Sequence, residues 1–179
     1  MITDDYLPMA LREFKRLKAL AEKALAQVPA DRFFEAPGAE DNSLAVIVKH
    51  VAGNLRSRWR EFLSTDGEKP DRNRDAEFVV GAEDTSEHLM AAWEEGWGLL
   101  FGALSPLSGA DLGRTVLIRG EPLSVLVVIN RQLTHYAYHV GQIVFLAKHF
   151  AGSKWTSLSI PKGQSEAFNQ APKKYLGKV

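Results

Sequence analysis

Cysteine is absent from this chain of 179 residues. Its absence excludes disulfides, zinc–thiolate sites, iron–sulfur clusters and a cysteine nucleophile. Any thiol chemistry at a site in this protein therefore requires a thiol supplied from outside the chain.

An excess of charge of either sign is also missing, because 22 lysine and arginine residues balance 22 aspartate and glutamate residues. Without a net field, nucleic acids and anionic membrane surfaces are not expected partners. The longest apolar stretches, such as residues 125–129, are far too short to span a bilayer, and the N-terminus lacks the features of a signal peptide. We therefore expect a cytoplasmic protein with a small-molecule substrate.

The length fits one domain, residues 1–179. Apolar residues recur at steps of three and four in four segments, which predicts four helices. These segments run from Leu7 to Val28, from Leu44 to Phe62, from the capping sequence at residues 84–87 to Leu104, and from about Pro122 to Gly152. The expected fold class is all-α, an antiparallel four-helix bundle with a long inter-helix loop and a C-terminal tail.

The loop between the second and third predicted helices, residues 66–78, is long and highly charged. Its charges alternate in sign and Pro70 limits its flexibility. We expect an ordered loop, pinned by arginine–carboxylate pairs of Arg58, Arg72 or Arg74, that shapes the molecule near the bundle rather than contacting a metal. Residues 115–120 are typical of a short strand in a small hairpin, and residues 153–179 of a tail partly packed on the body.

Two histidines one helical turn apart, His135 and His139, carry the strongest chemical signal. Their four-residue spacing places both imidazoles on one helix face, close enough to bind one metal ion. His50 lies beside the apolar stripe of the second predicted helix. A lone histidine in such a place more often bonds to a carbonyl, but three could converge if these helices are neighbours. We therefore predict His50, His135 and His139 as metal ligands.

Three neutral imidazoles leave a divalent ion with its full charge and with open positions, as in catalytic sites, whereas structural zinc sites are usually closed by four ligands. A water or thiol on such an ion loses its proton near neutral pH. On helical spacing, Asn54, Gln132 and Gln142 are the candidates to orient the rings. His88, at the start of the third predicted helix, and His149, off the ligand stripe, are not expected to bind the ion.

Two glycines, Gly53 and Gly141, lie close to these histidines inside predicted helices, where glycine is unfavourable. They leave room either above a bound ion or for close helix packing. No serine lies in a Gly-x-Ser-x-Gly motif or beside an obvious histidine–aspartate arrangement, so a serine hydrolase is not expected.

The histidine pattern also carries a family resemblance. His50 in an early helix, with His135 and His139 spaced H-x-x-x-H before residues 141–143 in the last, resembles the DinB/YfiT superfamily of metal-binding four-helix bundles. Residues 50–59 and 62–78 more closely resemble one branch of that superfamily, a domain-of-unknown-function family. The resemblance implies an antiparallel bundle, usually dimeric, with zinc or nickel at positions matching His50, His135 and His139.

Superfamily relatives include bacillithiol transferases and mycothiol-dependent maleylpyruvate isomerases, which use low-molecular-weight thiols. The resemblance therefore implies a metal-dependent enzyme in which the ion activates an external thiol or a water for attack on a small electrophilic substrate. The reaction would be transferase-like or hydrolase-like, and a low-molecular-weight thiol is the candidate co-substrate. The alternative is a non-enzymatic dimeric bundle, stress-related or an interaction protein, with a structural or vestigial metal site.

Overall fold

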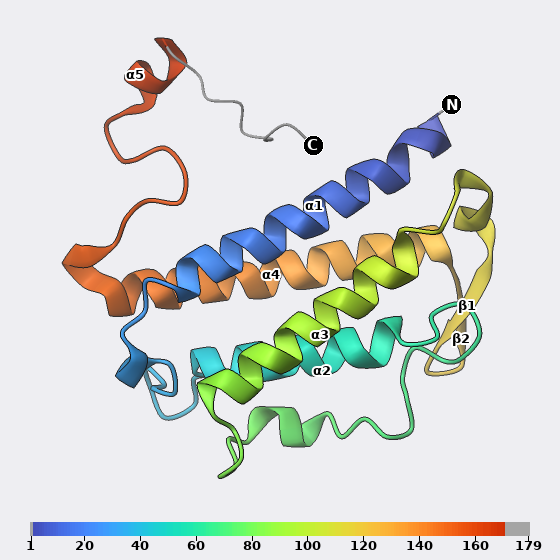
Figure 1. The fold of residues 1–179 in the computed structure, drawn as a ribbon, viewed down its shortest axis with the longest axis horizontal. Coiled ribbons are helices and arrows are strands. Elements are labelled where there is room, and N and C mark those ends of the chain that lie inside the picture. The colour runs from blue at the N-terminus through green and yellow to red at the C-terminus, as the bar shows by residue number, and fades with distance from the viewer. Residues whose placement is uncertain (1, 171–179) are drawn as a thin grey trace.

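Four long helices form the body of the computed structural model, which describes residues 2–170 and the side chains of residues 5–170 (Figure 1). They are α1 (Ile2–Leu25), α2 (Leu44–Trp59), α3 (Ser86–Leu104) and α4 (Val125–Ala151). The smaller elements are the 3₁₀ helices η1 (Ala30–Arg32), η2 (Asp75–Phe78), η3 (Gly109–Gly113) and η4 (Gly152–Lys154), the strands β1 (Thr115–Ile118) and β2 (Glu121–Ser124), and the short α5 (Ser165–Gln170). The predicted all-α helical bundle is confirmed.

In the bundle, α1 runs parallel to α4 and α2 runs parallel to α3 (Figure 1). The first pair runs in the opposite direction to the second. Helix α1 packs mainly on α4, and α2 packs mainly on α3. The hydroxyl of Tyr6, near the start of α1, donates to Asn130 near the start of α4 at 2.8 Å. Gln27 bonds to Thr156 just beyond the other ends of the same two helices. The connection of residues 60–85 therefore runs the length of the bundle before α3 begins (Figure 1).

Hydroxyl caps begin three of the helices. The side chains of Ser43, Thr85 and Ser124 each accept a hydrogen bond from the backbone amide three residues later. The last of these caps corrects a predicted boundary, because α4 begins at Val125 while Pro122 lies in β2. Helix α2 ends at Trp59, whereas the predicted segment extended to Phe62.

The core is rich in aromatic side chains. Phe14, Trp93, Trp97 and Tyr136 are fully buried between the helices, and Trp93 and Trp97 both come from α3. The hydroxyl of Tyr136 accepts a hydrogen bond from Nε1 of Trp59 and donates one to Oδ1 of Asn54, each at 3.0 Å. These two bonds connect α4 to α2.

The expected hairpin precedes α4. Its strands are antiparallel, with Thr115 opposite Ser124 and Ile118 opposite Glu121. Arg119 and Gly120 form the turn with φ angles of 56° and 76°, as a two-residue type I′ turn requires. The carboxylate of Asp66 accepts hydrogen bonds from the backbone amides of both turn residues, at 2.8 and 2.7 Å. The hairpin is thereby attached to the start of the charged connection.

The chain after α4 is partly packed on the body, as expected. Trp155 and Leu158 are half-buried against the core, whereas residues 171–179 of the predicted tail lie outside the described residues. Within residues 2–170, none of the helices combines the length and apolar character needed to cross a membrane.

Candidate metal centre

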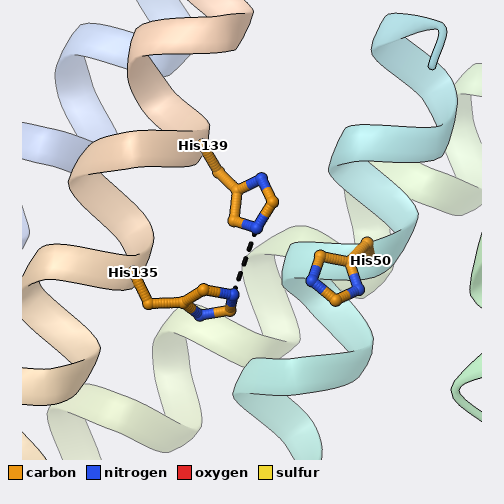
Figure 2. Close-up of side chains that lie close together, drawn as sticks. All are labelled: His50, His135 and His139. Carbon is orange, nitrogen blue, oxygen red and sulfur yellow. Dashed lines mark hydrogen bonds between the residues drawn. The ribbon is translucent and has the colours of Figure 1, made fainter. Parts of the chain in front are cut away.

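The three predicted ligands lie together between α2 and α4. His50 projects from α2, and His135 and His139 project from successive turns of α4 (Figure 2). One ring nitrogen from each lies within 4.8 Å of the others, and the Nε2 atoms of His135 and His139 are 3.1 Å apart. The tertiary structure thus joins the pair on α4 to the third histidine.

This geometry fits a single metal ion. Two imidazole nitrogens at the usual zinc distance in a tetrahedral site lie about 3.3 Å apart, close to the 3.1 Å between His135 and His139. A ring nitrogen of His50 faces this pair (Figure 2) and completes a set whose atoms all lie within 4.8 Å of one another. Imidazole ligands without a thiolate suit zinc and nickel.

The outward-facing nitrogens of two of the rings have hydrogen-bond partners. Nδ1 of His50 lies 2.8 Å from Oε2 of Glu77, and Nδ1 of His139 lies 2.9 Å from Oε1 of Gln142. Because both partners are oxygens that accept, each Nδ1 carries a proton, which leaves Nε2 as the nitrogen that can bind an ion. Such outer partners orient ligating histidines in known metal sites.

Of the three residues expected to orient the rings, Gln142 takes that role. Asn54 instead accepts from the hydroxyl of Tyr136. Gln132 is buried, and its side-chain oxygen has no hydrogen-bond partner within the described part of the chain. The sequence did not predict that Glu77 would orient His50. The one available signal was that Glu77 follows Arg72 closely in a charged loop, where the two could form an ion pair.

The loop of residues 66–78 lies against the site, and that it does not contact the metal itself stays a prediction. Its residue Glu77 bonds directly to a predicted ligand. Arg72 donates from Nε and Nη2 to the two oxygens of Glu77, at 2.8 and 2.9 Å, and forms an ion pair with Glu68 at 3.2 Å. The side chains of Arg72 and Glu77 are only 5% and 8% exposed. The expected arginine–carboxylate pairs therefore hold Glu77 against the ring of His50.

Gly53 makes this contact possible. A Cβ atom at this position of α2 would lie 2.4 Å from Oε1 of Glu77, which is far inside contact distance. At Gly141 of α4, an added Cβ would meet no atom within 4 Å among the described residues. The room at Gly53 thus accommodates the loop carboxylate rather than an ion or a neighbouring helix.

The two histidines of α4 are neutral at pH 7. Burial lowers the pKa of His135 to about 3, and the nearby His139 and His50 act in the same direction. Burial also lowers the pKa of His139 to about 4, against the opposing effect of its bond to Gln142. Neutral imidazole is the form that binds metal ions.

Glu77 is ionised under the same conditions. Burial alone would raise the pKa of Glu77, but the hydrogen bonds from His50 and Arg72 outweigh burial and hold it below its ordinary value. A carboxylate thus faces the outer nitrogen of His50, where it stabilises positive charge on the ring or on a bound ion.

A cavity of about 180 Å³ lies beside the cluster. His50 and His135 line one part of it, next to Gln132. The arginines Arg58, Arg72, Arg74, Arg119 and Arg131 line much of the rest. A molecule in this cavity would lie next to the histidines.

The other two histidines are elsewhere, as predicted: His88 and His149 are both exposed, and Nδ1 of His88 bonds to the carbonyl of Glu83.

A four-helix bundle with three converging imidazoles defines the chain as a helical-bundle protein with a candidate metal centre. Residues 1–164 match the model of the family described as "Protein of unknown function (DUF1572)", and the chain belongs to that family. No curated protein matches the sequence.

Proposed function

We propose that this protein is a metal-dependent enzyme in which His50, His135 and His139 bind one divalent ion, zinc or nickel. Its reaction joins an external thiol, or water, to a small electrophilic substrate. The observation that carries the proposal is the convergence of three ring nitrogens within 4.8 Å at the wall of a cavity. A structural zinc site would more often be closed by a fourth protein ligand.

The ion, when bound, would supply positive charge that lowers the pKa of a water or thiol beside it. The chain provides the surroundings for that chemistry. Glu77 and Gln142 fix the orientation of two ligand rings, and burial keeps His135 and His139 in their neutral, ligating form. The cavity next to His50 and His135 offers space for the substrate. Since the sequence contains no cysteine, a thiol nucleophile must come from outside.

The proposal includes membership of the DinB/YfiT superfamily. The four-helix bundle and the position of the histidines on α2 and α4 support it.

The proposal also includes a cytoplasmic location, where low-molecular-weight thiols are kept reduced, and a homodimer. Exposed aromatic side chains on α4 support the dimer, since Tyr138 and Phe145 are 57% and 74% exposed.

Elemental analysis of the purified protein tests the metal site. We expect about one zinc or nickel ion per chain, and loss of most of it in His135→Ala, because two imidazoles rarely retain an ion. The matched control is His149→Ala, which removes an exposed histidine from the same helix and should keep the ion. Full occupancy in His135→Ala would show that the site is wrongly assigned.

Enzymatic function is tested separately. Metal-free protein, metal-restored protein and His135→Ala are assayed against a panel of small electrophiles with several low-molecular-weight thiols or with water alone. The proposal is supported if turnover returns when metal is restored to the wild-type protein and is absent from His135→Ala. Metal-loaded protein without turnover across the panel would favour the non-enzymatic alternative.

Light scattering tests the proposed dimer. We expect a mass of about twice the 19.8 kDa of one chain.

A further inference from the structure

We infer that the cavity beside the histidine cluster binds the carboxylate group of a small organic acid, through Arg58 and Arg131. The inference builds on the proposed function, because it names the substrate class for the same site. Two observations carry it: a buried guanidinium group with two nitrogens that have no hydrogen-bond partner in the described part of the chain, and an excess of positive charge around the cavity.

The first observation concerns the guanidinium group of Arg58. The side chain lies at the C-terminal end of α2, and the residue is only 4% exposed. Its Nε and Nη1 atoms have no hydrogen-bond partner among residues 5–170, and its ion pair with Glu68 is long, at 3.8 Å. Burying a charged group without full pairing is costly. Arg58 lines the cavity, and an anion there would offset the charge that Glu68 pairs only at long range.

The balance of charge is the second observation. One carboxylate, that of Glu68, is shared by Arg58, Arg72 and Arg119, with closest distances of 3.8, 3.2 and 3.5 Å. The carboxylate of Glu77 is already bonded to Arg72 and to His50. Five guanidinium groups therefore line a cavity whose lining contains no carboxylate among the described residues, although Asp66 adds negative charge near Arg58.

Two further arginines of the cavity are available to a ligand. Arg131 is exposed and has no ion pair with any other described residue, and Arg74 lies over the ring of Phe78 at 5.0 Å. Neither arginine has an ion pair among the described residues, so an anion entering the cavity would be attracted to both.

The shape and chemistry of the cavity favour a small carboxylic acid. The planar guanidinium fork matches a carboxylate in a two-bond arrangement. Gln132 adds a polar side chain to the lining of the cavity. The volume of about 180 Å³ limits the ligand to a small molecule. Since His50 and His135 line the same space, a carboxylate held by the arginines places the rest of the ligand beside the histidines.

Calorimetric titration of the metal-free protein with malonate tests this inference. The metal is removed with 1,10-phenanthroline, an uncharged chelator that does not compete for a cationic site, and ionic strength is held constant. We expect saturable binding of one malonate per chain, weakened about ten- to a hundredfold by Arg58→Gln and about tenfold by Arg131→Gln, because each loses a charge-assisted hydrogen bond. Arg16→Gln, which removes an equal charge from an exposed position on α1, is the matched control and should bind as the wild type does.

Three results would overturn the inference: malonate that does not saturate, equal affinity in all variants, or saturable binding of inorganic phosphate without binding of malonate. Arg131 is exposed, so Arg131→Gln remains informative if Arg58→Gln fails to fold. The outcome is independent of the metal. Malonate binding in a protein that never retains an ion would contradict the proposed function alone, and a metal-loaded enzyme without a malonate site would contradict only this inference.

Discussion

The Nδ1 atom of His50 lies 2.8 Å from Oε2 of Glu77, and this contact joins helix α2 to the charged connection that follows it. Arg72 holds the same carboxylate through two hydrogen bonds. The position of a predicted metal ligand therefore depends on a loop 27 residues further along the chain. Two of the predictions below test this contact, and two test hydrogen bonds that connect other elements of the fold.

Glu77→Gln should weaken metal binding about ten- to a hundredfold, because a neutral amide orients His50 less firmly and makes its ring a weaker donor to the ion. Competition with a chromophoric zinc indicator measures the affinity. Asp75→Asn, an exposed change in the same 3₁₀ helix, is the control and should leave the affinity unchanged. Equal affinity in the two variants would show that Glu77 plays no part in binding.

Gly53→Ala should weaken metal binding and also lower folding stability, because it breaks the buried pair of Glu77 with Arg72. The new Cβ would lie 2.4 Å from Oε1 of Glu77 and displace this carboxylate from His50 and Arg72. Against that disruption, alanine is favoured over glycine inside a helix by about 1 kcal/mol. Chemical denaturation and the indicator assay, run on the same sample, separate the two effects.

The control for this substitution is Gly141→Ala on α4. A Cβ there meets no described atom within 4 Å, so the variant should gain up to about 1 kcal/mol of stability and bind metal as the wild type does. If Gly53→Ala behaves in the same way, the packing of Glu77 against α2 is irrelevant to the site.

Asp66 should make folding stability depend on pH in the acidic range. Its carboxylate accepts from the backbone amides of Glu68, Arg119 and Gly120, and these bonds, that from Glu68 first, lower its pKa below the ordinary value. The stabilisation is fully present above the unfolded pKa of about 3.9 and is lost as the pH falls through the lower folded value.

Asp66→Asn removes this effect because asparagine does not titrate, and its amide nitrogen cannot accept a hydrogen bond in place of a carboxylate oxygen. The variant should be less stable than the wild type at pH 7, and the difference should shrink as the pH falls below about 4. Urea denaturation at a series of pH values measures it. A difference that stays constant down to pH 2 would contradict the assigned role of the carboxylate.

Tyr136→Phe should lower the free energy of unfolding by about 1–3 kcal/mol, because it leaves the buried groups of Trp59 and Asn54 without their shared partner. Metal stoichiometry should not change. Tyr138→Phe is the control, since Tyr138 is 57% exposed and its ring is retained. Thermal or urea unfolding that shows equal stability for both variants would contradict the prediction.

Local sequence patterns predicted most of the secondary structure. Apolar periodicity located four helices, and hydroxyl residues such as Ser43 and Thr85 marked helix starts. The start of α4 was misplaced because proline is tolerated both in a first helical turn and in a short edge strand. Pairing with β1 decided between the two, and placed Pro122 opposite Leu117.

The sequence by itself also determined that His135 and His139 share one helix face, because the spacing of four residues is a property of the helix alone. Only the tertiary structure decided that His50 meets them, that Glu77 reaches His50, and that five arginines surround one cavity. Each of these contacts joins residues from different elements. They depend on which helices are neighbours and on the path of the connection between α2 and α3, and these are set by packing over the whole core rather than by any local pattern.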